Sequence, residues 1–131
     1  MKGATRLILI LGDQLDLQSA ALRQCRRETD EIIMIESANE ASYVWSHKAK
    51  IALFLSAMRH FARALEDQKY PLVYIKESTL SIVEVLREQI LQKKISHLIC
   101  VEPGEWRLRK ALEALAAELN VELEILEDEH F

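Results

Sequence analysis

The chain has 131 residues, of which 50% are hydrophobic, and this length and composition suit one domain with a single core. Its 17 basic and 21 acidic residues give a formal net charge of −4, so the domain lacks the basic excess of a surface that follows nucleic-acid phosphates. The apolar run 7–11 is too short for a signal peptide, and no run approaches the roughly 20 residues of a membrane span. We therefore expect a cytoplasmic protein with no membrane contact, and one domain over residues 1–131.

The two cysteines, Cys25 and Cys100, are too far apart in sequence to form a metal or redox motif. They also cannot provide the dense disulfide framework of a small secreted protein. We expect both to be reduced thiols, with Cys100 inside a buried strand.

Short apolar runs alternate with longer segments of helical period along the chain. The runs are rich in Ile, Leu and Val and have little polar alternation, as expected for strands buried on both faces: 6–11, 31–35, 72–75, 97–101 and 122–126. The segments between them predict helices over 17–26, 46–66, 81–93 and 105–120. Ser81 and Glu84 fit a capping box at the start of the third helix.

This alternation predicts repeated βαβ units and therefore an α/β fold. Right-handed crossovers favour a Rossmann-like, doubly wound domain with a five-stranded parallel sheet in the order 3-2-1-4-5 and helices on both faces. Ligands of such folds bind beyond the carboxyl ends of the strands, near the point where the strand order reverses.

The loop after the first strand carries Gly12, Asp13 and Gln14. The glycine lets the backbone turn sharply or approach a ligand, while the other two present an acceptor and an amide. Gly-Asp is also a common turn pair, so the loop taken alone favours a plain strand-ending turn. The loop matches neither the G-x-G-x-x-G pattern nor the P-loop, so it does not indicate a pyrophosphate cradle.

Two further loops end at the same edge of the predicted sheet. Glu36 directly follows the second strand, where a carboxylate can accept hydrogen bonds from ribose or ribityl hydroxyls, or simply be solvated. After the fourth strand come Glu102, Gly104 and Trp106. The tryptophan ring could stack on a flat ligand, or it could pack beneath the side chain of Arg107.

No pattern in the sequence indicates a metal site or a catalytic nucleophile. His47 and His60 lack the i, i+4 spacing and nearby acid of a zinc site. The neighbours Ser46 and His47 do not place a hydroxyl against an imidazole. We expect neither metal ligands nor catalytic residues in this chain.

Four stretches carry a family resemblance: 7–15 (LILILGDQL), 34–65 (MIESANEASYVWSHKAKIALFLSAMRHFARAL), 101–108 (VEPGEWRL) and 124–131 (EILEDEHF). In order and spacing, across almost the whole chain, they resemble the photolyase-related proteins of bacteria, the group of the iron–sulfur bacterial cryptochromes and (6-4) photolyases. AMRHFA and PGEWR are the more specific segments, and GDQL alone is weak. In one departure, Tyr70 and Pro71 stand where the family turns from the long helix into the next strand with a glycine.

The resemblance implies an N-terminal domain that binds an antenna chromophore, 6,7-dimethyl-8-ribityllumazine. In the family, FAD and a [4Fe-4S] cluster belong to a C-terminal helical domain, which would be the partner of this domain and its route to damaged DNA. Light-driven repair, a lyase activity, would then need that domain, and the present chain alone would be catalytically inert. Two cysteines cannot supply the four thiolates of such a cluster.

Carried over by position, the resemblance implies lumazine contacts from Gly12, Asp13, Gln14 and Glu36. Tyr43, Lys50 and Ile51 would line the pocket, and Glu102, Gly104 and Trp106 are second-rank candidates, since their loop could equally serve the contact between domains. An exposed docking face could instead drive the isolated domain to form a homodimer. The alternative function is a stand-alone nucleotide- or flavin-binding module without a light function, and a hydrolase or transferase is the weakest alternative.

Overall fold

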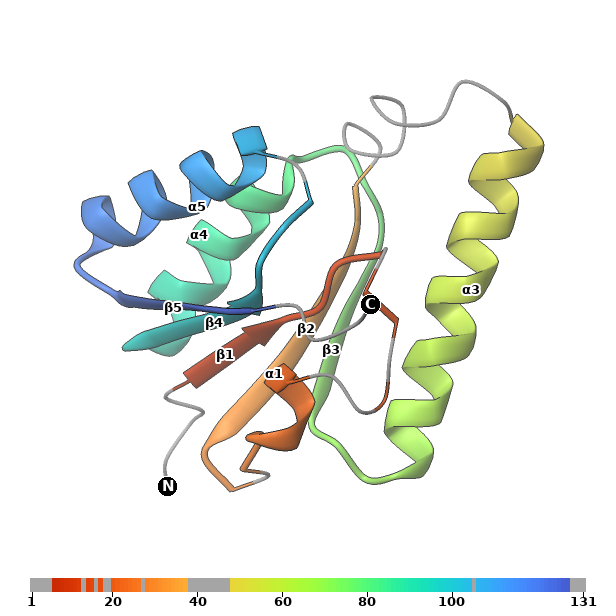
Figure 1. The fold of residues 1–131 in the computed structure, drawn as a ribbon, viewed down its shortest axis with the longest axis horizontal. Helices are drawn as coiled ribbons and strands as arrows, with labels where there is room; N and C mark the ends of the chain where they lie inside the picture. Colours follow the sequence, from red (N-terminus) through yellow and green to blue (C-terminus); the bar gives the residue numbers. More distant parts are fainter. Residues whose placement is uncertain are drawn as a thin grey trace.

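A computed structural model describes residues 6–12, 14–15, 17, 20–26, 28–37, 48–104 and 106–127 of the chain (Figure 1). The strands in chain order are β1 (Arg6–Leu9), β2 (Asp30–Ser37), β3 (Leu72–Ser78), β4 (His97–Val101) and β5 (Glu122–Leu126). The helices are α1 (Ala20–Arg23), α3 (Lys48–Asp67), α4 (Ile82–Lys93) and α5 (Trp106–Leu119).

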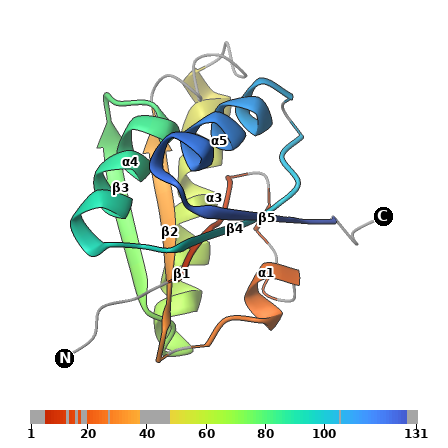
Figure 2. The same cartoon turned by 90° about the vertical axis from the view of Figure 1, so that its left-hand side faces the viewer.

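The strands form one sheet in the order β3-β2-β1-β4-β5, and every neighbouring pair is parallel. This confirms the predicted fold class and strand order. Figures 1 and 2 show α4 and α5 on one face of the sheet and α3 on the other. The chain reverses its direction of winding after β3, so the switch point lies between β1 and β4.

The core consists of two apolar layers, one on each face of the sheet. Alternate residues of the same strands supply the two layers, because successive side chains of a strand point to opposite faces. The layer beneath α4 and α5 includes Leu7, Leu9, Ile33, Ile35, Leu98, Cys100, Leu86, Ile90, Leu112 and Leu115. The layer beneath α3 and α1 includes Ile8, Ile10, Ile32, Met34, Ile99, Val101, Met58, Phe61, Ala62, Leu65, Ala21 and Leu22.

The ends of two helices show how local sequence sets the fold. Ser81 caps α4 as predicted: its side chain accepts from the backbone N–H of Glu84, whose carboxylate accepts from the backbone N–H of Ser81. At the end of α3, Lys69 adopts a left-handed conformation, with φ of 68°. A lysine thus makes the reversal before Tyr70 and Pro71, at a small conformational cost.

The predicted helix over 17–26 is wrong in extent, because α1 is limited to Ala20–Arg23. Cys25 donates a tight-turn hydrogen bond to the carbonyl of Leu22 at 3.1 Å, and the backbone N–H of Arg26 donates to the carboxylate of Asp30 at 2.8 Å. The buried Asp30 therefore takes a donor that a longer helix would have used. Conversely, β2 and β3 run to Ser37 and Ser78, beyond their predicted ends.

Neither cysteine forms a disulfide in the structure. Cys100 is buried in β4, as predicted, and burial raises the pKa of its thiol to about 11. The thiol is therefore protonated at neutral pH, which makes it unreactive as a nucleophile. Within the described ranges, no helix has the length and apolar character needed to cross a membrane.

The two-layer core predicts different effects for two leucines. Leu98 is 0% exposed in β4 and Leu91 is 61% exposed on α4. We expect Leu98→Ala to lower the free energy of unfolding by about 2 to 5 kcal/mol through lost burial and a cavity. Leu91→Ala should change it by less than about 0.5 kcal/mol. Urea denaturation followed by circular dichroism measures both, and equal effects would contradict the assigned burial.

Candidate functional site

The ends of β1, β2 and β4 bring three predicted loops to one edge of the sheet. In the register of the sheet, Leu9 of β1 pairs with Ile33 of β2 and with Cys100 of β4. The β1–β2 pairing continues past Leu9, since the N–H of Ile10 donates to the carbonyl of Ile33 at 3.1 Å. The first loop, the end of β2 and the loop after β4 are therefore neighbours, as the switch-point argument predicted.

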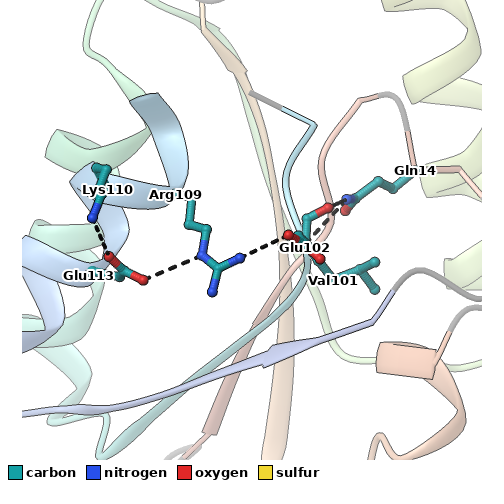
Figure 3. Close-up of polar contacts among 6 residues, drawn as sticks. All are labelled: Gln14, Val101, Glu102, Arg109, Lys110 and Glu113. Carbon is teal, nitrogen blue, oxygen red and sulfur yellow. Dashed lines mark hydrogen bonds and ion pairs between the residues drawn. The ribbon is translucent and has the colours of Figure 1, made fainter. Parts of the chain in front are cut away.

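Gln14 bridges the switch point itself. Its side-chain amide nitrogen donates to the carbonyl oxygens of Val101 at 3.2 Å and of Glu102 at 3.1 Å (Figure 3). The backbone N–H of Gln14 donates to the carbonyl of Leu11 at 2.9 Å, which closes a turn around Gly12. The amide thus ties the loop after β1 to the loop after β4, and the two loops are held in one geometry.

The β4 side of this edge continues into a charged network on α5 (Figure 3). Arg109 pairs with Glu102 at 2.8 Å and with Glu113 at 3.4 Å, and Lys110 lies 3.9 Å from Glu113. These side chains are 38% to 58% exposed, so each pair contributes little to stability. The network orients the start of α5 and leaves its polar groups open to solvent.

Trp106 begins α5 and is 68% exposed. The ammonium of Lys110 lies 5.2 Å from the ring centroid, a distance at which a cation interacts with an aromatic face. The ring is therefore neither core nor buried beneath an arginine. Gly104, which is also exposed, lies in the bend just before it.

On the opposite face of the sheet, Glu36 is the centre of a second polar cluster. The side chain of Arg59 on α3 donates twice to this carboxylate, from Nε to Oε2 at 2.7 Å and from Nη2 to Oε1 at 2.8 Å. The hydroxyl of Tyr74 on β3 donates a short hydrogen bond to Oε2. We call Glu36, Arg59 and Tyr74 the Glu36 cluster.

The charges and the burial of the Glu36 cluster favour one set of protonation states. The side chain of Glu36 is 1% exposed and that of Arg59 is 42% exposed. The hydrogen bond and the negative charge of Glu36 raise the pKa of Arg59. Burial, followed by the bond to Glu36, raises the pKa of Tyr74. At neutral pH the cluster therefore holds one cation and one anion joined by a bidentate bond, and a neutral phenol.

Comparison with known proteins decides the family. Residues 8–131 match the family model described as deoxyribodipyrimidine photo-lyase-related protein. A (6-4) photolyase of Agrobacterium fabrum (strain C58 / ATCC 33970) is 37% identical over an alignment of 131 positions, which covers 97% of this chain and 26% of that relative. The chain belongs to the deoxyribodipyrimidine photo-lyase-related family. It spans about a quarter of the length of this relative.

Six of the site residues predicted for this photo-lyase-related chain are placed by the structure. Gly12, Gln14 and Glu36 lie on the β1 and β2 side of the carboxyl edge, and Glu102, Gly104 and Trp106 lie on the β4 side. Gln14 joins the two groups through Glu102. Asp13 and Tyr43 lie outside the described residues, and of Lys50 and Ile51 only the backbone, in the first turn of α3, is described.

Sequence reasoning missed Arg59 and Tyr74. One signal was available: a carboxylate that ends a buried strand needs a cation or several donors, and the long helix after it is the nearest element that can supply one. Tyr74 pairs with Met34 of β2 in the register of the sheet, a placement that the sequence alone did not fix. Across the described part of the chain, no three His, Cys, Asp or Glu side chains come together as a metal site.

The Gln14 bridge predicts that Gln14→Glu, which keeps the size of the side chain, lowers stability more than the truncation Gln14→Ala. Gln14→Ala loses both hydrogen bonds, which should cost about 1 to 2 kcal/mol. Gln14→Glu instead points a carboxylate oxygen at two carbonyl oxygens, so it should cost more than Gln14→Ala. Gln92→Glu on the exposed surface of α4 is the matched control and should change stability by less than about 0.5 kcal/mol. Urea midpoints measure all three, and a Gln14→Glu variant as stable as the parent would contradict the bridge.

Proposed function

We propose that this chain is the antenna-binding domain of a photo-lyase-related protein. It binds a lumazine-type chromophore, 6,7-dimethyl-8-ribityllumazine, at the carboxyl edge of its sheet. It also docks on a helical domain that carries FAD and an iron–sulfur cluster, for light-driven DNA repair or photoreception. Membership of the family supports this proposal, and so does the gathering of polar groups at the edge where doubly wound folds bind ligands.

The observation that carries the proposal is that hydrogen bonds tie the loops and strand ends of this edge together. Gln14 fixes the loops after β1 and β4 against each other, and Arg59 fixes Glu36 at the end of β2. A site whose polar groups are already oriented binds without the entropy cost of ordering them. Such preformed edges suit a ligand with a flat ring and several hydrogen-bonding groups.

The chemistry of the edge fits an uncharged ribityllumazine. The guanidinium of Arg59, whose side chain is 42% exposed, offers N–H groups that match ring carbonyls and ribityl oxygens. Gln14 and Glu36 support the edge by holding the loops and the arginine in place. Asp13, Tyr43, Lys50 and Ile51 would complete the contacts, as the family resemblance implies. When bound, the lumazine would absorb near-ultraviolet light, and this chain would hold it in a fixed orientation.

The remaining chemistry belongs to the partner domain in this proposal. The chain has two cysteines, too few for a four-iron cluster, and its net charge of −4 does not favour direct contact with DNA. Exposed Trp106 and Leu53 provide apolar surface of the kind that a second domain would cover. This chain alone should therefore show no repair activity.

Fluorescence titration of the purified chain with 6,7-dimethyl-8-ribityllumazine tests the proposal. We expect saturable binding, weakened about tenfold or more in Glu36→Gln, which loses the charge that holds the Glu36 cluster together. Glu118→Gln is the control, because Glu118 pairs with Arg87 at 2.7 Å on the far side of the sheet, and its binding should match the parent.

Absence of lumazine binding at high micromolar ligand would contradict the antenna function of the isolated chain. Tight binding of a nucleotide or flavin under the same conditions would instead favour the stand-alone module.

A further inference from the structure

The Glu36 cluster contains two groups that a ligand could meet, and their exposure differs sharply. The carboxylate of Glu36 is enclosed, with 1% of its side chain exposed, whereas 42% of the Arg59 side chain is exposed. A ligand that arrives from solvent reaches the guanidinium and not the carboxylate. Glu36, which the sequence predicted as a ligand contact, is thus the enclosed residue of the pair.

Arg59 lies on the helix that faces this edge. Helix α3 begins at the carboxyl edge of the sheet and runs back along the face that carries Ile32 and Met34 (Figure 1). Met58, next to Arg59 in sequence, is 2% exposed and packs into that layer. The backbone that carries Arg59 is therefore anchored, and the guanidinium is held at the end of β2.

The hydrogen bonds with Glu36 orient this guanidinium. Its Nε and Nη2 atoms both bond to Glu36, so the planar group cannot rotate without breaking two charge-assisted hydrogen bonds. Tyr74 bonds to the same Oε2 atom that accepts from Nε, which limits rotation of the carboxylate in turn. A guanidinium oriented in this way keeps its N–H groups in one fixed plane, the geometry that recognition of a planar acceptor requires.

We propose that Arg59 is the ligand-contacting residue of this edge and that Glu36 and Tyr74 are its positioning residues. This inference rests on the proposed function and assigns its contact chemistry. Because Glu36 neutralises Arg59, the pair carries no net charge. The guanidinium of this pair therefore suits a ligand with oxygen acceptors that is held by hydrogen bonds.

Lumazine titration of four variants tests this assignment. Arg59→Lys keeps the charge but loses the planar fork, and we expect affinity to fall about tenfold or more, with the emission maximum of the bound ligand shifted. Tyr74→Phe removes one hydroxyl and should weaken binding about fivefold. Arg87→Lys is the matched control, since Arg87 is 40% exposed and ion-paired with Glu118, and its affinity should equal that of the parent.

The double variant Glu36→Gln, Arg59→Gln is used if Arg59→Lys does not fold. It removes both charges together, so no buried carboxylate is left unpaired. It should also lose binding. In the parent chain, affinity should change less than about twofold between low and high salt, because salt screens charge–charge attraction and the ligand is uncharged.

The outcomes separate the two proposals. If the parent binds lumazine and Arg59→Lys, or the folded double variant, binds it equally well with an unchanged emission maximum, the role of Arg59 is refuted and the antenna function stands. A fall in thermal stability without a change in affinity or emission would reduce Arg59 to a structural residue and also refute the inference. If the parent does not bind lumazine, both proposals fail.

Discussion

In a parallel sheet covered by helices on both faces, the strand interiors favour apolar side chains, and buried polar ones are accommodated most easily where strands end. In this chain the strand interiors fill two apolar layers, and the buried polar residues of β2 are at its ends: Asp30 at the start, Glu36 and Ser37 at the finish. Each of these needs partners, since an unpaired buried polar group costs several kcal/mol. The positions of Arg6, Arg59, Tyr74 and the carbonyl of Leu80 follow from this requirement.

The same constraint explains why the two sides of the carboxyl edge differ. At the end of β2 the carboxylate is enclosed and must be neutralised by a bidentate arginine. After β4 the carboxylate of Glu102 is half exposed and needs only a solvated pair with Arg109. Gln14 lies between them and joins the loops through backbone carbonyls, which cannot titrate. The described part of this edge is thus tied together by hydrogen bonds and ion pairs on both sides of the switch point.

Much of this architecture could be predicted from the sequence. Apolar runs separated by helical segments identified the strands, because these patterns are local to each segment. The right-handed crossover rule then favoured the observed strand order. The short α1 could not be predicted, since Asp30, several residues later, takes the donor of Arg26. Arg59 and Tyr74 were missed for a similar reason: their role depends on Glu36, which is distant in sequence and adjacent only in the fold.

The family resemblance and the switch-point argument independently chose the same edge, and family membership is shown. The central claim is that this edge, on the α3 face of the sheet, holds the chromophore. A crystal structure of the chain soaked with 6,7-dimethyl-8-ribityllumazine tests this most directly. Our account predicts the ligand beyond the ends of β1 and β2, with an oxygen within hydrogen-bond distance of the Arg59 guanidinium. Ligand bound beside Trp106 on the α5 face, or away from the carboxyl edge, would contradict it.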